Sequence, residues 1–229
     1  MKKLLTSFGG IVTITACAAL VMGDDATQTA IEPTHHALLN GVDLAGWDAV
    51  GGAADESWSV ADGVLTCRLG NGPWLRSAET FGDFNLRLDY RVEPGANGGI
   101  YVRVPADGNH HRDNTTLPPA GFEVQLLDDS SGKYSNLKDY QHSASVYDLA
   151  GAARIVTKPP GEWNTLEIDC RGNRVRIVHN GAVVVEIDEQ RCPLLALRET
   201  SGYLGLQNHG GGVSFRNIRI GDSLDEASK

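Results

Sequence analysis

The sequence predicts an all-β protein built as a sandwich or barrel of antiparallel strands. Short runs of apolar, β-branched and aromatic residues recur along most of the chain, and turn-forming residues separate them. Glycine occurs 27 times and proline nine times in 229 residues, as tight turns between short strands require. No convincing amphipathic helix and no repeat of 20–50 residues is visible, which argues against helical folds, propellers and solenoids.

Composition is that of a globular protein with a sizeable core. Hydrophobic residues make up 41% of the chain and charged residues 21%. The net charge is −9 and no cluster of basic residues occurs, so a nucleic-acid partner is excluded. An acidic surface suits a protein that handles a neutral substrate.

The N-terminal segment, residues 1–23, predicts an export signal. Lys2 and Lys3 precede an uncharged, mostly apolar run over residues 4–22, which ends before Asp24. We expect cleavage after Gly23 and a periplasmic, cell-surface or secreted bacterial protein. Residues 14–17 also resemble a lipobox, which would leave a lipid anchor on Cys17 as the chain's one membrane contact. An uncleaved membrane anchor is a third reading of the same run.

Residues 24–36 are polar and are expected to form a linker, before one domain over 37–221 and a tail over 222–229. The clearest strand is 84–92, in which apolar residues alternate strictly with polar ones. Asn180-Gly181 predicts a hairpin between two later strands. We expect roughly a dozen strands, and those placed by their residues are 57–60, 64–69, 84–92, 99–104, 121–127, 164–170, 175–179, 182–187, 203–207 and 213–220.

Two long irregular stretches, 105–119 and 128–160, are expected to be functional loops, and 193–199 is expected to form one or two helical turns. Cys67, Cys170 and Cys192 remain after the export signal. Their spacing fits no zinc site. Three buried thiols are the preferred interpretation, and one disulfide with one free thiol is the alternative.

Eight phrases along the chain carry a family resemblance. They are LNGVDLAGW from Leu39, WSVADGVL from Trp58, FGDFNLR from Phe81, NGGIYVR from Asn97, GFEVQLLD from Gly121, PGEWN from Pro160, GLQNHG from Gly205 and VSFRNI from Val213. In this order, over about residues 37–221, they resemble the 3-keto-disaccharide hydrolase family. The resemblance implies a concanavalin-like jelly-roll sandwich of two curved antiparallel sheets, with a concave groove for a carbohydrate.

The alternation of side chains along the expected strands identifies candidate site residues independently of the family resemblance. The non-core faces of three expected strands carry polar or aromatic side chains that could bind a sugar, or that could simply face water. These pairs are Tyr101 with Arg103, Glu123 with Gln125, and Gln207 with His209. Asn97, at the start of its phrase, and Trp74, as an exposed stacking ring, complete the expected substrate-binding set. Trp47, Trp58 and Trp163 are expected in the core.

The carboxylates do not fit a conventional retaining glycosidase. Such enzymes need two carboxylates about 5 Å apart, but Gln125 stands two residues after Glu123, and Asp128, five residues on, falls on the opposite face. The substrate that the resemblance implies needs only one base and one acid: a 3-keto group acidifies the C2 hydrogen, and elimination followed by hydration gives net hydrolysis. The resemblance therefore implies that Glu123 and His209 share these catalytic roles, in an order left open.

The enolate formed in this way would be stabilised by Arg103, Gln125 or a bound divalent cation. No metal ligand set is assigned. His110 and His111, near Asp107 and Asp113, could bind a metal, but a solvated loop is preferred.

Two other functions remain open. One is a non-catalytic carbohydrate-binding module, which the same fold and groove would serve. The other is a conventional glycosidase in which Asp128, Asp129 or Glu162 supplies the second carboxylate. A cofactor, the exact sugar and the oligomeric state are not specified by the sequence.

Overall fold

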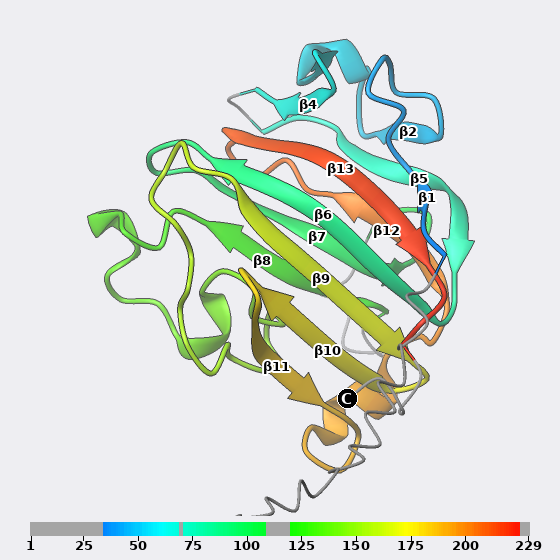
Figure 1. Ribbon diagram of the computed structural model, residues 1–229, viewed down its shortest axis with the longest axis vertical. Helices are drawn as coiled ribbons and strands as arrows, with labels where there is room; N and C mark the ends of the chain where they lie inside the picture. Colours follow the sequence, from blue (N-terminus) through cyan, green and yellow to red (C-terminus); the bar gives the residue numbers. More distant parts are fainter. Residues whose placement is uncertain (1–33, 69–70, 109–119, 225–229) are drawn as a thin grey trace, which may run out of the picture. The chain divides into compact units, whose positions relative to one another are not determined.

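The computed structural model describes residues 34–68, 71–108 and 120–224, within the unit Glu32–Lys229. Strands dominate this part of the chain, and the helices are single short 3₁₀ turns (Figure 1). The strands are β1 (His36–Ala37), β2 (Trp47–Val50), β3 (Trp58–Ala61), β4 (Val64–Cys67), β5 (Trp74–Phe81), β6 (Phe84–Val92), β7 (Asn97–Val104), β8 (Phe122–Leu127), β9 (Asn164–Arg171), β10 (Arg174–His179), β11 (Ala182–Ile187), β12 (Gly202–Leu206) and β13 (Val213–Gly221). The 3₁₀ turns are η1 (Ala54–Glu56), η2 (Gly132–Tyr134), η3 (Asp139–Gln141) and η4 (Pro193–Leu197).

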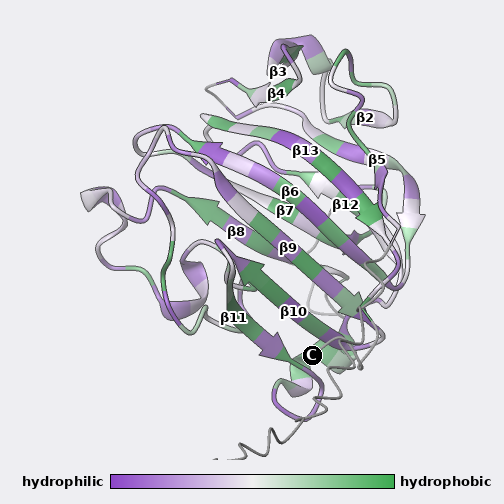
Figure 2. Cartoon of the chain, viewed as in Figure 1, coloured by the Kyte–Doolittle hydropathy of each residue, from purple (hydrophilic) through white to green (hydrophobic). Residues whose placement is uncertain are grey.

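The larger sheet has eight antiparallel strands in the order β11-β10-β9-β6-β13-β4-β3, with β1 paired to β13. Figure 2 shows hydrophobic and hydrophilic bands alternating along β6, β9 and β13. In β6 the residues Phe84, Leu86, Leu88, Tyr90 and Val92 are all buried, as the alternation predicts. The predicted hairpin is also present: Asn180 and Gly181 join β10 to β11, both with positive φ.

The smaller sheet has five antiparallel strands in the order β2-β5-β12-β7-β8. Its core face carries Ile100, Val124 and Leu126, which belong to the same buried cluster as Phe84 and Ile168 of the larger sheet. The predicted all-β sandwich of two antiparallel sheets is therefore confirmed. Two strands of this sheet, β2 and β5, were not expected, because only Trp47 in β2, and Leu75 and Ser77 in β5, are buried and the apolar alternation is lost.

A β-bulge in β7 corrects the expected position of Arg103. Tyr203 pairs with Val104 and Gly205 with Tyr101, so two residues of β7 lie opposite one of β12. Arg103 takes the left-handed conformation, with φ of 53°. The side chain consequently leaves the face that Tyr101 occupies, and only 2% of it is exposed. The simple parity argument was wrong for Arg103 because it assumed an unbroken period of two.

The segment between β8 and β9 covers the free edge of β8. Backbone N–H groups of Ala144 and Tyr147 donate to the carbonyls of Gln125 and Glu123 at 2.8 Å and 2.9 Å, and Gln125 N–H donates to Ser145 at 3.0 Å. This pairing buries all six residues of β8 and blunts an edge that would otherwise be free to pair with another chain.

The three described cysteines are free and buried, which bears out the preferred interpretation. Burial raises the pKa of both Cys67 and Cys170 to about 12, so these thiols stay protonated at neutral pH. Trp47 and Trp58 lie in the core as expected, whereas Trp163 is only half-buried and packs beneath the guanidinium groups of Arg91 and Arg216. No helix in the described ranges is long and apolar enough to cross a membrane.

Candidate functional site

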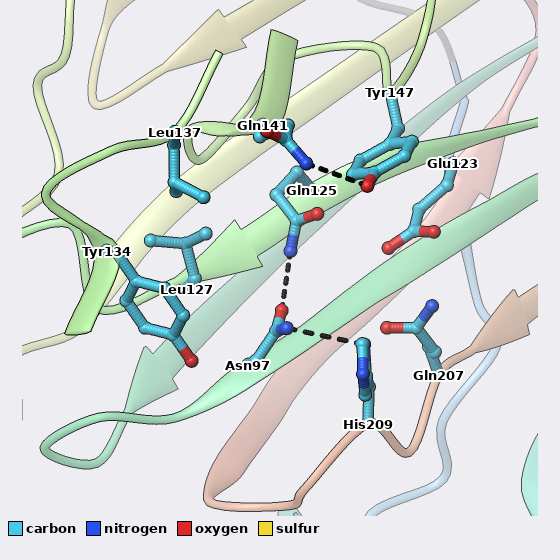
Figure 3. A pocket seen from close by; sticks show the side chains of 10 residues that line it. All are labelled: Asn97, Glu123, Gln125, Leu127, Tyr134, Leu137, Gln141, Tyr147, Gln207 and His209. Carbon is cyan, nitrogen blue, oxygen red and sulfur yellow. Dashed lines mark hydrogen bonds between the residues drawn. The ribbon is translucent and has the colours of Figure 1, made fainter. Parts of the chain in front are cut away.

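A pocket of about 340 Å³ lies on the face of the smaller sheet that is turned away from the core (Figure 3). It brings together five of the residues that the sequence singled out, from β7, β8 and the segment after β12. These are Asn97, Glu123, Gln125, Gln207 and His209. Leu127, Tyr134, Leu137, Gln141 and Tyr147 complete the lining.

Strand pairing explains why these side chains meet. In β8, Glu123, Gln125 and Leu127 point to the pocket while the residues between them point to the core. Their partners in β7 are Tyr101, Gly99 and Asn97, respectively. Residues directly opposite on neighbouring strands lie side by side on one face. Glu123, Gln125, Leu127 and Asn97 therefore share the face that lines the pocket, and Tyr101 lies beside Glu123 outside the lining.

Glu123 lies flat over the glycine of the middle pair. Its side chain is only 3% exposed, and a Cβ atom added at Gly99 would overlap its carboxylate and Cγ. The glycine therefore leaves the space in which the Glu123 carboxylate rests beside Tyr101 and Gln207.

A chain of three hydrogen bonding side chains crosses the floor from β8 to the segment after β12. The amide nitrogen of Gln125 donates to Asn97 Oδ1 at 2.7 Å, to the Gly98 carbonyl at 2.9 Å and to the Leu126 carbonyl at 3.3 Å. The amide nitrogen of Asn97 in turn lies 3.3 Å from His209 Nδ1. His209 follows β12 in an exposed turn, and this chain ties its ring to the sheet (Figure 3).

Tyr101 lies beside Glu123 and carries a neutral phenol. Burial raises the pKa of Tyr101 to about 12; the neighbouring Glu123 carboxylate adds to the rise, and a hydrogen bond with the Gln207 side chain opposes it. Gln207 is 9% exposed, and its Oε1 atom is buried without a hydrogen-bond partner in the described part of the protein. A buried acceptor of this kind is available to a ligand hydroxyl group.

The outer wall of the pocket was not predicted residue by residue. Tyr134, Leu137, Gln141 and Tyr147 all come from the segment between β8 and β9, whose length marked it as functional. Gln141 donates to the Tyr147 hydroxyl oxygen at 2.9 Å. The segment is held in place at Asp129, which pairs with His142 Nδ1 at 3.0 Å. Irregular backbone has no period, so the sequence gives no sign of which of these side chains face inward.

Three expected sugar-binding residues lie outside the pocket lining: Tyr101, which is beside Glu123, and Trp74 and Arg103. Trp74 is not an exposed stacking ring: it is half-buried, packs closely over Gly205 and Gly108, and meets Tyr101 edge-on with centroids 5.3 Å apart. Arg103 lies at the end of the sandwich, where its guanidinium donates to backbone carbonyls of the turns at Gly82 and Gly172. Trp74 therefore supports Tyr101 from the side, and Arg103 binds the protein itself.

Glu123 is the one carboxylate that lines the pocket among the described residues. Asp128 accepts hydrogen bonds from Gly95 N–H and from Ser130; burial alone would raise its pKa, but these hydrogen bonds outweigh it and the pKa is lowered. Asp129 is occupied by His142, Ser143 and Thr157. Both aspartates therefore hold the loop together, as capping residues do.

Within the same residues no group of three His, Cys, Asp or Glu side chains is arranged to hold a metal ion. The loop candidates His110, His111 and Asp113 lie outside the described residues, as do the export signal and Cys17.

We expect Gly99→Ala to lower any reaction rate that depends on the Glu123 carboxylate by about 100-fold, because the added methyl group displaces this carboxylate by roughly 1 Å. Gly132→Ala is the matched control, since a Cβ there meets nothing within 4 Å and its backbone is not left-handed. Steady-state rates and melting temperatures of the two variants test this. Equal rates for both variants would contradict the assigned position of Glu123.

Comparison with known proteins places this site in context. The model of the 3-keto-alpha-glucoside-1,2-lyase-like domain matches residues 34–221. A 3-keto-disaccharide hydrolase from Bacteroides thetaiotaomicron is 28% identical over 221 residues, covering 80% of this chain and 76% of the relative. The crystal structure of a proposed glycosyl hydrolase from Parabacteroides distasonis superposes with a TM-score of 0.69 at 27% identity, over 82% of this chain and 99% of that one. A β-glucanase from Bacillus licheniformis shares the fold alone, with a TM-score of 0.55 at 10% identity over 83% of this chain and 98% of the glucanase.

Proposed function

The chain belongs to the 3-keto-alpha-glucoside-1,2-lyase-like family, and on this premise we propose that it cleaves the glycosidic bond of 3-keto-disaccharides or 3-keto-glucosides by elimination and hydration. The observation that carries the proposal is a pocket with one carboxylate, Glu123, facing the same space as one imidazole, His209. That is the set of groups that proton transfer at C2 requires.

One base and one acid are enough for a balanced reaction. A base takes the proton from C2, and the electron pair of the C2–H bond forms an enolate whose negative charge lies on the C3 oxygen. When the enolate collapses, the C3 ketone returns, a C1–C2 double bond forms and the C1–O bond breaks, with the leaving oxygen taking up a proton. Water then adds to C1, losing one proton to the base, while C2 regains one. The sum is hydrolysis without a covalent sugar–enzyme bond.

The other polar groups in and beside the pocket suit a carbohydrate. Gln207 Oε1 can accept from a sugar hydroxyl, and the Tyr101 phenol remains a donor at neutral pH. Donors directed at the C3 oxygen would stabilise the enolate in a buried site, where such hydrogen bonds are worth more than in water.

The structure gives no support to a conventional glycosidase. That mechanism needs a second carboxyl group about 5–9.5 Å from the first, whereas Asp128 and Asp129 are engaged in the loop and Glu162 lies outside the pocket lining. A non-catalytic carbohydrate-binding module would use the same pocket, and turnover distinguishes it from an enzyme.

Incubation with a 3-keto-glucoside in D₂O tests the proposal. We expect glucoside cleavage and deuterium at C2 of the released 3-keto sugar, because the C2–H bond is broken and remade; mass spectrometry and NMR read both. Parallel reactions with a chelator test for a divalent cation, and the unoxidised disaccharide is the control. Cleavage without deuterium would favour a conventional glycosidase, and binding without cleavage a carbohydrate-binding module.

We further propose that the protein is exported, on the strength of Lys2, Lys3 and the apolar run over residues 4–22. We expect a mature N-terminus at Asp24, measured by mass spectrometry of the protein isolated from the cell envelope or medium. Retention of Met1 in a cytoplasmic fraction would contradict export, and incorporation of labelled fatty acid that is lost in Cys17→Ser would show the lipoprotein route.

A further inference from the structure

We infer that Gln125 and Asn97 are positioning residues that hold His209 as the neutral tautomer with its proton on Nε2. His209 then acts on the substrate as a hydrogen-bond donor, which leaves Glu123 as the base. The chemical part of this inference rests on the proposed function; the tautomer itself does not.

The backbone fixes the amide orientation of Gln125. Its nitrogen lies within hydrogen-bond distance of the carbonyl oxygens of Gly98 and Leu126, at 2.9 Å and 3.3 Å. A carbonyl oxygen can only accept. Exchanging the amide oxygen and nitrogen of Gln125 would bring its oxygen against both carbonyls, so the nitrogen must face them. The side chain is only 4% exposed, and little water is available to relieve such a conflict.

Asn97 is fixed in turn by Gln125. The 2.7 Å contact between the two amides requires an acceptor on Asn97, because the Gln125 nitrogen is a donor. The Asn97 oxygen therefore faces Gln125 and its nitrogen faces His209, as Figure 3 shows. Because Asn97 accepts from Gln125 through its oxygen, it can offer only its nitrogen, a donor, to His209.

His209 receives the last hydrogen bond at Nδ1. The Asn97 nitrogen lies 3.3 Å from Nδ1 and can only donate to it. A proton on Nδ1 would place two donors against each other, so Nδ1 must be unprotonated, and the neutral ring carries its proton on Nε2. The partner of one ring nitrogen determines in this way what the other nitrogen can do.

This tautomer assigns the two roles that the residue types leave open. A neutral imidazole with the proton on Nε2 is a donor at that atom and cannot take a proton from C2 there. The C2 proton then goes to a Glu123 carboxylate oxygen, while Nε2–H donates to the C3 oxygen as its charge develops. The proton on Glu123 is then available to the departing oxygen, and His209 ends the step as it began.

The ¹⁵N NMR spectrum of histidine-labelled protein tests the tautomer directly. The chain has seven histidines, and the signals lost in His209→Gln identify this ring. At a pH where the ring is neutral, we expect His209 of the wild type to show an unprotonated Nδ1 and a protonated Nε2. A protonated Nδ1 would overturn the inference, whether or not the protein cleaves 3-keto-glucosides.

The variant Asn97→Asp tests the positioning role. A carboxylate opposite Nδ1 should draw the proton to that nitrogen. We expect kcat to fall at least tenfold with a smaller change in KM, because substrate binding does not depend on the tautomer alone. Asn71→Asp adds the same charge at an exposed turn and should change neither spectrum nor rate. An unchanged tautomer and rate in Asn97→Asp would contradict the inference, and a changed tautomer with no turnover in any protein would contradict only the proposed function.

Discussion

Glu123→Gln is expected to lower kcat for 3-keto-glucoside cleavage by about 10²–10⁴-fold, the range that a general base contributes. The amide keeps the shape of the carboxylate and its fit over Gly99, so KM and the melting temperature should change little. The loss falls on kcat because proton abstraction from C2 is the step that needs the carboxylate. Deuterium exchange at C2 of the unreacted substrate, measured in D₂O, should decrease in the same proportion as the rate.

Glu162→Gln is the matched control, since this glutamate is exposed and does not line the pocket. Its rate should equal that of the wild type. Retention of more than a tenth of the wild-type kcat by Glu123→Gln would remove Glu123 from the role of base. A tenfold loss in both variants would point to a general effect of charge on substrate approach.

The polar pairs of the pocket were predictable where the strands are regular. Phe122, Val124 and Leu126 form an apolar face in β8, and this alone placed Glu123 and Gln125 together on the other face. The alternation also placed Gln207 correctly, because its backbone N–H donates to the Gly99 carbonyl at 2.9 Å and so extends the pairing of β12 with β7. His209 lies beyond the end of β12 and was singled out chiefly through the family resemblance.

The sequence could not predict what depends on contacts between distant segments. Leu137, Gln141 and Tyr147 reach the pocket because their loop pairs with the edge of β8, and no local pattern encodes that pairing. Trp74 begins β5, a strand that lacks clean alternation, so its packing against Gly205 was not foreseeable. The roles proposed for Glu123 and His209 depend on a chain of amide orientations, which only three-dimensional contacts reveal.

Arg103→Met is expected to lower the free energy of unfolding by about 3 kcal/mol, while the folded variant keeps its wild-type KM. The guanidinium donates to the Gly82 carbonyl at 2.9 Å and 2.7 Å and to the Gly172 carbonyl at 2.6 Å, with Asp83 at 3.3 Å. Methionine fills a similar volume but leaves both carbonyls without their charged donor, and hydrogen bonds to charged groups are each worth about 1.5–3 kcal/mol. Urea denaturation measures the loss.

Arg103→Lys shows how much of the stabilisation comes from the shape of the guanidinium and how much from its charge. Lysine keeps the charge at position 103 but is a single point donor, so it can satisfy only one of the two turns that the planar guanidinium joins. Arg103→Lys should therefore recover part of the stability and not all of it. Arg174→Met, which breaks the exposed pair with Glu186, should cost less than about 1 kcal/mol. If Arg103→Met instead left the unfolding free energy unchanged and raised KM tenfold, the residue would act on the substrate, and the turns at Gly82 and Gly172 would not need it.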